Sequence, residues 1–168
     1  MADLNVVLEH QHNTQWCWAA VTQGVCRYFG DAASTQESIV CQTLDNPGCC
    51  ATPVPTACNI PQPLEWALDL DTVKHLNRQT GGALSFDEVR EQIETLARPV
   101  PICLMFTGQL GQTNHYWLIK GCAMIGNVPY VTVLDPSPVN GLESHIAYDD
   151  LCSGLTLGGA WTDSFTLR

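Results

Sequence analysis

Cys17 has the clearest chemical potential of any residue in this sequence. It lies in the run Trp16-Cys17-Trp18-Ala19-Ala20, at the position where we expect the first helix to begin. Backbone N–H groups and the positive end of the helix dipole would then face its sulfur and favour the thiolate over the thiol. A thiolate is the nucleophile of covalent acyl chemistry. We therefore predict that Cys17 is a nucleophile, against the alternative of a small, inert core residue.

Gln11 is the expected donor to an oxyanion. Thiolate attack on a carbonyl creates an oxyanion, which a side-chain amide N–H can stabilise together with the N–H of the nucleophile. Gln11 precedes Cys17 by six residues, whereas Gln15 is nearer but would have to reach back past Trp16. We predict Gln11 as the donor and keep Gln15 as its rival. A solvated surface glutamine is the alternative for either.

His115 is the expected base. It opens the apolar run that begins Tyr116-Trp117, so its imidazole should lie at the edge of a strand and face a cleft. A base there would take the thiol proton or form an ion pair with the thiolate. The alternative is a purely structural histidine. We interpret the sequence's other histidines as ordinary because they lack comparable context.

Asp135 is the expected partner of His115. It ends a second apolar run, just before Pro136, and the two runs are predicted to form a hairpin. If the turn centres on Ile125, Asp135 lies directly opposite His115; if it centres on residues 126–127, the two are three positions out of register. A carboxylate in either place can orient the imidazole. A turn-starting aspartate before proline is the alternative.

Helices are expected in the first half of the chain. Apolar residues recur at spacings of three and four over residues 17–29, which predicts a helix that ends before Gly30. Residues 34–37 (Ser-Thr-Gln-Glu) are typical of a capping box and predict a second helix. Residues 45–63 are rich in proline and cysteine and predict a loop that is cross-linked or otherwise pinned. A short helix is expected over residues 64–70.

Strands dominate the second half. A capping box at residues 85–88 predicts a helix to about residue 97. Apolar runs predict strands at the following residues: 73–76, 100–106, 115–124, 129–134, 146–148 and 161–167. Val6 to Leu8 is a further short strand candidate. The order predicts one α+β domain over residues 1–168, with a helical lobe at about 11–72, an antiparallel sheet lobe at about 73–168 and a cleft between them.

Composition narrows the classes of function. Hydrophobic residues make up 45% of the 168 residues and charged residues 14%, which is typical of a globular protein. The formal net charge of −10 disfavours nucleic-acid binding. No apolar run is long enough to cross a membrane. The first residues lack a basic stretch followed by an apolar segment, so no secretory signal is expected there.

The nine cysteines are many for a reducing compartment. Four of them lie close together in the predicted loop region: Cys41, Cys49, Cys50 and Cys58. Disulfide bonds are the preferred interpretation, since adjacent cysteines chelate zinc poorly and no histidine is nearby. We expect no metal site and no cofactor. The remaining cysteines besides Cys17 are expected in the core: Cys26, Cys103, Cys122 and Cys152.

The order of Gln11, Cys17, His115 and Asp135 resembles that of papain-like cysteine peptidases. The sequence is most similar to small bacterial members, namely avirulence effector proteases and related toxin domains. The resemblance covers about residues 11–138 and is carried by these features: Cys17-Trp18-Ala19-Ala20, the pair Cys49-Cys50, the strand led by His115, Asp135-Pro136, and the segment 84–88 before a helix. His115 follows the cysteine more closely than the roughly 130–150 residues of papain itself, and Asp135 stands where papain has asparagine.

The resemblance implies a trimmed papain-like fold and cleavage of a peptide bond in a protein substrate. It implies secretion, or delivery into a target cell, with an immunity or inhibitor protein as a further partner. Nucleic acid and membrane are not expected partners. Trp16 and Trp117 are expected to line the cleft as substrate-binding residues.

Several alternatives remain open at this level. The same residues could cut a double-glycine leader peptide, deamidate glutamine or transfer an acyl group. A cell-wall peptidase is a further variant. A binding module of a different class, stapled by disulfide bonds and catalytically silent, would keep the fold without the reaction.

Overall fold

A computed structural model describes residues 2–108, 111–139, 142–154 and 158–168. The first half contains three helices: α1 (Cys17–Tyr28), α2 (Gln36–Thr43) and α3 (Leu64–Leu68). Two short 3-10 helices lie between α2 and α3: η1 (Pro47–Cys50) and η2 (Thr56–Cys58). The expected order of helices before strands is therefore present.

The remaining elements build one antiparallel sheet. Its strands are β1 (Ala2–Asp3), β2 (Leu76–Gly81), β3 (Val100–Gly108), β4 (Gly111–Ile125), β5 (Val128–Leu134), β6 (Glu143–Ala147) and β7 (Gly159–Leu167). Two helices accompany them: α4 (Phe86–Arg90), which continues into the π-helical turn η3 (Glu91–Thr95), and α5 (Tyr148–Ser153). The strand order is β2-β7-β3-β4-β5-β6, and β1 pairs with β4. The predicted α+β class is confirmed.

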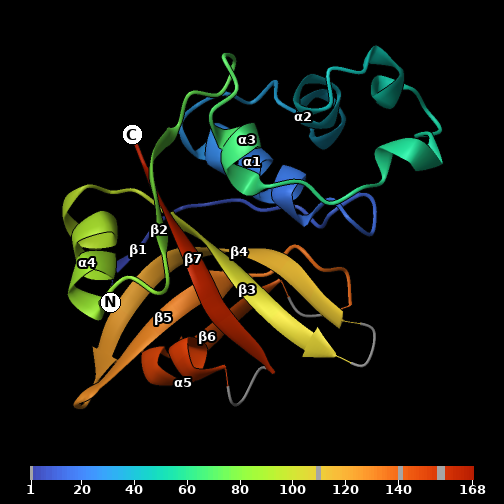
Figure 1. Cartoon of the computed structure of the whole chain (residues 1–168). Helices are drawn as coiled ribbons and strands as arrows, with labels where there is room; N and C mark the ends of the chain where they lie inside the picture. Colours follow the sequence, from blue (N-terminus) through green and yellow to red (C-terminus); the bar gives the residue numbers. More distant parts are fainter. Residues whose placement is uncertain (1, 109–110, 140–141, 155–157) are drawn as a thin grey trace.

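The sheet separates two hydrophobic cores. Alternation along β4 puts Tyr116 and Leu118 in the core shared with α1, α2 and α3. Trp117 and Ile119 lie in the second core, which α4, η3 and α5 help to cover. Figure 1 shows α1–α3 gathered above the sheet and α5 below it. The helices and the sheet thus meet along one face of β3, β4 and β7.

Local sequence signals account for the helix ends. Gly30 adopts a positive φ of 97° just past α1, as its position predicted. The capping box of Ser85 with Glu88 starts α4. At α2 the box is shifted by one residue from the prediction, because Thr35 is the N-cap and Ser38 returns the hydrogen bond. The second helix is therefore confirmed with a different cap.

Two strand predictions are wrong in position. Residues 6–8 form no strand; Val6 and Leu8 are buried against α1, where Gly24 leaves room for the Leu8 side chain. The chain joins the sheet earlier, through β1. The strand expected at 73–76 begins instead at Leu76, because residues 70–74 form a turn in which Lys74 has a positive φ of 51°.

Candidate active site

A groove of about 690 Å³ runs between the helices and the sheet. The groove has a helical wall and a wall of strands. The strands are β2, β3, β4 and β7, and the helical wall is formed by these residues: Gln15, Cys17, Trp18, Pro61, Gln62, Pro63 and Glu65. Cys17 lines this groove, although its exposed fraction is 7%. Clefts of this size between structural layers are usual places for substrate binding. The expected cleft between helices and sheet is present, and the predicted nucleophile lies in its wall.

Cys17 is the first residue of α1. Trp16 is the N-cap, and the first turn contains no acidic residue. The positive end of the helix dipole is therefore not offset by a carboxylate on the same turn. The backbone N–H of Cys17 belongs to the first turn, whose N–H groups have no partner inside the helix. This local geometry is the one predicted from the sequence.

His115 connects Cys17 to Asp135. Its Nε2 donates to Oδ1 of Asp135 over 2.6 Å, and the side chain of Cys17 acts on the same ring closely enough to raise the pKa of His115. Since Nε2 is used by Asp135, Nδ1 is the nitrogen left to face the sulfur. The side chain of Asp135 is 6% exposed and that of His115 is 19% exposed. The structure therefore brings three of the four predicted catalytic residues together around His115.

The surroundings of His115 favour its protonated form. Burial by itself lowers the pKa of the imidazole, but the hydrogen bonds to Asp135 and Cys17 and their charges raise it to about 9. At neutral pH the ring is therefore an imidazolium. An imidazolium held beside a cysteine sulfur is the arrangement that stabilises a thiolate nucleophile.

A β-bulge places His115 and Asp135 on the same face of the sheet. The hairpin turns at residues 126–127, and a regular ladder from there would pair Asp135 with Leu118, three positions from His115. Lys120 is the extra residue that shifts the register by one. Asp135 then lies diagonal to His115 on one face, because alternate residues share a face. The turn predicted at residues 126–127 is thus confirmed, whereas the predicted pairing of Leu118 with Asp135 is wrong by one residue, since Leu118 pairs with Leu134.

The loop after β5 fixes the carboxylate. Oδ1 of Asp135 also accepts a hydrogen bond from the backbone N–H of Ser137 over 2.9 Å, and the backbone N–H of Asp135 donates to the carbonyl of Leu142. Asp135 is therefore both the partner of His115 and the start of a turn. The two interpretations offered as alternatives from the sequence hold together.

Gln11 is not placed as predicted. Its amide nitrogen donates to the backbone carbonyls of Asn13 (3.0 Å) and Thr14 (2.8 Å), which uses both amide hydrogens. Its backbone N–H donates to the carbonyl of Pro136, so Gln11 supports the loop beside Asp135. Gln15, the rival, lines the groove with Cys17. Residues 13–16 form a turn, and this turn brings Gln15 rather than Gln11 to the groove.

Neither tryptophan expected to bind substrate lines the groove. Trp16 is fully buried, and its indole N–H donates to the carbonyl of Cys58 over 2.8 Å. Trp117 is 6% exposed and lies in the core on the other face of the sheet, where its ring stands edge-on to that of His115. Trp117 therefore packs beside the base, and Trp16 binds the backbone of residue 58. Trp18 instead forms part of the groove wall.

Other residues of the groove were not predicted from the sequence. Tyr116, Glu65 and Asp163 all line the groove. Tyr116 was within reach of the prediction, since strand alternation puts it on the face opposite Trp117. Glu65 and Asp163 carried no such signal, because they come from elements far from Cys17 in sequence.

Two disulfide bonds pin the loop between α2 and α3. They join Cys41 to Cys50 and Cys49 to Cys58. This confirms the predicted disulfide bonds of the loop. Cys26, Cys103 and Cys122 are buried as expected, whereas Cys152 is half-buried.

The pinned loop contacts the start of α1 directly. Besides the bond from Trp16 to Cys58, the indole N–H of Trp18 donates to the carbonyl of Ile60. The side chain of Asn59 accepts from the backbone N–H of Gln15. Residues 58–60 thus hold the segment that carries the nucleophile.

A comparison with models of known protein families finds no match for this chain, and a search of curated proteins finds no similar sequence. Within the described residues, no helix is both long and apolar enough to span a membrane. The same residues contain no group of three or more His, Cys, Asp or Glu side chains placed to hold a metal ion. The geometry around Cys17 is therefore the basis for inferring function.

Proposed function

We propose that the protein is a papain-like cysteine endopeptidase that hydrolyses a peptide bond in a protein substrate. The observation that carries this proposal is the placement of His115 between Asp135, to which it is hydrogen-bonded, and Cys17, whose side chain raises its pKa, with Cys17 in the wall of the groove. Nucleophile, base and orienting carboxylate in this order are the parts that acyl transfer by a thiol requires.

The first half of the reaction forms an acyl-enzyme. The Cys17 thiolate attacks the scissile carbonyl carbon, a C–S bond forms, and the carbonyl electrons move to oxygen as an oxyanion. When the carbonyl re-forms, the C–N bond breaks. The His115 imidazolium gives its Nδ1 proton to the departing amine, which leaves as the new N-terminus.

The second half releases the acid. Neutral His115 accepts a proton from water, and the oxygen attacks the thioester carbon. The C–O bond forms, the C–S bond breaks, and the sulfur returns to the thiolate beside the imidazolium. Asp135 stays ionised and holds Nε2–H, so that Nδ1 faces the sulfur throughout.

Two donors are assigned to the oxyanion. The first is the backbone N–H of Cys17, which belongs to the first turn of α1. The second is the side-chain amide of Gln15, because it lines the groove while both amide hydrogens of Gln11 are engaged in the loop. Removing an oxyanion donor costs about 100- to 1,000-fold in kcat in a well-studied case.

The disulfide bonds bear on where the enzyme works. Disulfide bonds persist mainly in oxidising compartments, so the two bonds of the loop are compatible with an extracellular protein. We extend the proposal to a secreted enzyme or an effector delivered into a target cell. An immunity or inhibitor protein that covers the groove is the corresponding partner.

The direct test combines labelling with identification of products. An epoxysuccinyl inhibitor of thiol proteases should modify the wild-type protein at Cys17, and the Cys17→Ala variant should stay unmodified. Cys152→Ser is the matched control, because Cys152 is a free and more exposed thiol outside the groove. New N-termini should then accumulate in a cell lysate treated with wild-type or Cys152→Ser protein, and not with Cys17→Ala.

The outcomes separate the candidate reactions. New N-termini that depend on Cys17 support peptide cleavage, and cuts confined to double-glycine sites would point to leader cleavage. A mass change of about 1 Da at glutamine without new N-termini would point to deamidation instead. A protein that the inhibitor does not label and that changes no substrate would be a silent binding module, and the proposal would fail.

A further inference from the structure

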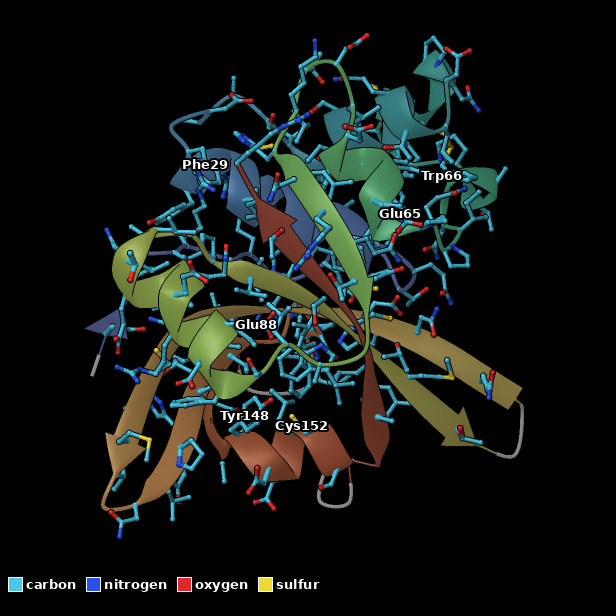
Figure 2. The ribbon with its side chains drawn as sticks, turned by 60° about the vertical axis from the view of Figure 1, so that its left-hand side comes forward. Phe29, Glu65, Trp66, Glu88, Tyr148 and Cys152 are labelled. Carbon is cyan, nitrogen blue, oxygen red and sulfur yellow. A yellow bond between two sulfur atoms is a disulfide. The ribbon has the colours of Figure 1, made fainter. Side chains whose placement is uncertain are left out.

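The groove beside Cys17 carries a carboxylate on each wall. Glu65 comes from α3 on the helical side, and Asp163 comes from β7 on the sheet side. Figure 2 shows Glu65 with Trp66 on α3, above the strands. Among the described residues that line the groove, none is a lysine or an arginine. The wall beside the nucleophile is therefore acidic.

The two carboxylates act on the same part of the groove as Cys17. Cys103 and Tyr116 are paired across β3 and β4, and both line the groove. Burial raises the pKa of the Cys103 thiol to about 11, and the charges of Asp163, Cys17 and Glu65 add to the rise. Both acids thus act electrostatically on a thiol of the groove on which Cys17 also acts.

Burial likewise raises the pKa of Tyr116, and the charges of Glu65 and Cys17 contribute to the rise. The hydroxyl of Tyr116 accepts from the backbone N–H of Leu64, the residue before Glu65. The Glu65 end of α3 is therefore held against the strand that carries His115. Glu65 thus lines the groove next to a residue that is hydrogen-bonded to Tyr116.

Neither carboxylate is neutralised by a described cation. Asp163 accepts a hydrogen bond of 3.2 Å from the amide of Gln79, which carries no charge. Across the described part of the chain, no lysine or arginine lies within ion-pair distance of Glu65 or Asp163, whereas Asp3, Glu143 and Glu9 all have such partners. A hollow with uncompensated charges of one sign attracts ligands of the opposite sign.

Apart from Cys17 and the two acids, the polar side chains that line the groove are neutral. Five amide side chains line it: Gln15, Gln62, Gln79, Gln112 and Asn114. Amides offer hydrogen bonds to a peptide backbone without selecting the charge of its side chains. Charge selection in this groove therefore falls to the two acids.

We propose that Glu65 and Asp163 are specificity-determining residues, and that the groove takes polypeptides with a lysine or arginine side chain next to the bond that is cut. This inference rests on the proposed peptidase function and deepens it by naming the substrate class. The two carboxylates stabilise the cationic side chain from opposite walls, and they repel peptides with an acidic residue at the same position.

Peptide binding tests the preference for a cationic side chain without requiring cleavage. The Cys17→Ala protein is titrated with three mixtures of acetylated, amidated heptapeptides that are identical except for a central Arg, Gln or Glu. We expect the Arg mixture to bind roughly ten-fold more tightly than the Gln mixture at low salt, and the Glu mixture to bind least. The preference should shrink as the salt concentration rises.

Matched variants assign the preference to the two acids. Glu65→Gln together with Asp163→Asn should abolish it, and Glu65→Gln alone should reduce it. Glu65→Gln serves as the second variant should the pair fail to fold. Glu91→Gln changes the net charge equally at an exposed position outside the groove and should leave the preference intact.

Equal binding of the three mixtures, an Arg preference that survives the double variant, or no measurable binding of any mixture would overturn the inference. Labelling of the wild-type protein at Cys17 reports on the peptidase proposal separately. Labelling without the Arg preference would therefore reject the substrate class and keep the enzyme.

Discussion

The two sides of the groove hold their catalytic residues by different means. On the helical side, hydrogen bonds to residues 58–60 hold the start of α1 in place. The disulfide bond between Cys49 and Cys58 in turn fixes residues 58–60. On the sheet side, His115 lies within the continuous ladder of β4 with β3. The described residues of the sheet contain no disulfide bond.

The difference follows from the local composition. Residues 45–63 contain five prolines and form two short 3-10 helices, so they offer few backbone hydrogen bonds of their own. Ordering such a segment costs conformational entropy that a cross-link reduces in the unfolded chain. The sheet orders its residues through backbone pairing. The nucleophile therefore depends on the redox state of the loop, whereas the base does not.

The largest effect should come from breaking the connection between the two sides. His115→Gln removes the group that protonates the leaving amine and pairs with the thiolate, so we expect kcat to fall about 1,000-fold. Circular dichroism should stay unchanged, because the ladder of β4 does not need the imidazole. His145→Gln, an exposed position on β6, is the matched control and should keep full activity. Retained activity in His115→Gln would contradict the assigned role.

The sheet side should respond to alkaline pH through His115. The pKa of His115 is about 9 in the folded protein, against 6.5 ordinarily, so the folded state binds this proton more tightly. The resulting stability is complete below about pH 6.5 and is lost as pH rises through 9, a loss of about 3 kcal/mol. Urea unfolding of wild type and His115→Gln at pH 6 and pH 10 measures the difference. A wild-type loss matched by the variant would show that other groups cause it.

The helical side should respond to reduction. Replacing both Cys49 and Cys58 by serine frees the segment 58–60, and we expect a loss of about 2–3 kcal/mol in stability. The kcat/KM should fall roughly ten-fold, because α1 loses its fixed start. Thermal unfolding measures the loss of stability, and a peptidase assay measures the fall in kcat/KM.

A disulfide-specific phosphine sharpens the same comparison. It reduces disulfide bonds and leaves the Cys17 thiol intact. Wild-type activity should therefore fall, whereas the activity of the Cys49→Ser/Cys58→Ser variant should change much less, because only the Cys41–Cys50 bond remains to be reduced. Cys122→Ser changes a free, buried thiol of the sheet and should respond to phosphine as the wild type does. Wild-type activity that survives complete reduction would mean that the loop does not support the nucleophile.

Much of this arrangement could be predicted from the sequence, because its signals are local. The Cys17 helix start, the capping boxes and the hairpin of β4 and β5 each follow from a few neighbouring residues. The pairing of His115 with Asp135 needed one tertiary fact, the bulge at Lys120, which no local pattern indicates. From the sequence, only two alternative registers of the hairpin could be predicted.

The wrong predictions for Gln11 and Trp16 share a different cause. Both were based on the distance from Cys17 along the chain, whereas the partners of these side chains are set by packing. The Gln11 amide donates to the carbonyls of Asn13 and Thr14, and the Trp16 indole donates to the carbonyl of Cys58. That contact joins residues 42 positions apart and depends on a disulfide pairing that spacing could not specify.

The smallest of these effects should come from Trp16→Phe. The substitution keeps an aromatic ring in the core but removes the indole N–H, so the buried carbonyl of Cys58 loses its donor. We expect a loss of about 1–2 kcal/mol in stability and a few-fold loss in kcat with little change in KM, because substrate does not touch this residue. Trp66→Phe, at an indole that is 58% exposed on α3, should change neither. A rise in KM for Trp16→Phe would instead restore the tryptophan to the substrate site and remove its role as the link between the pinned loop and the nucleophile.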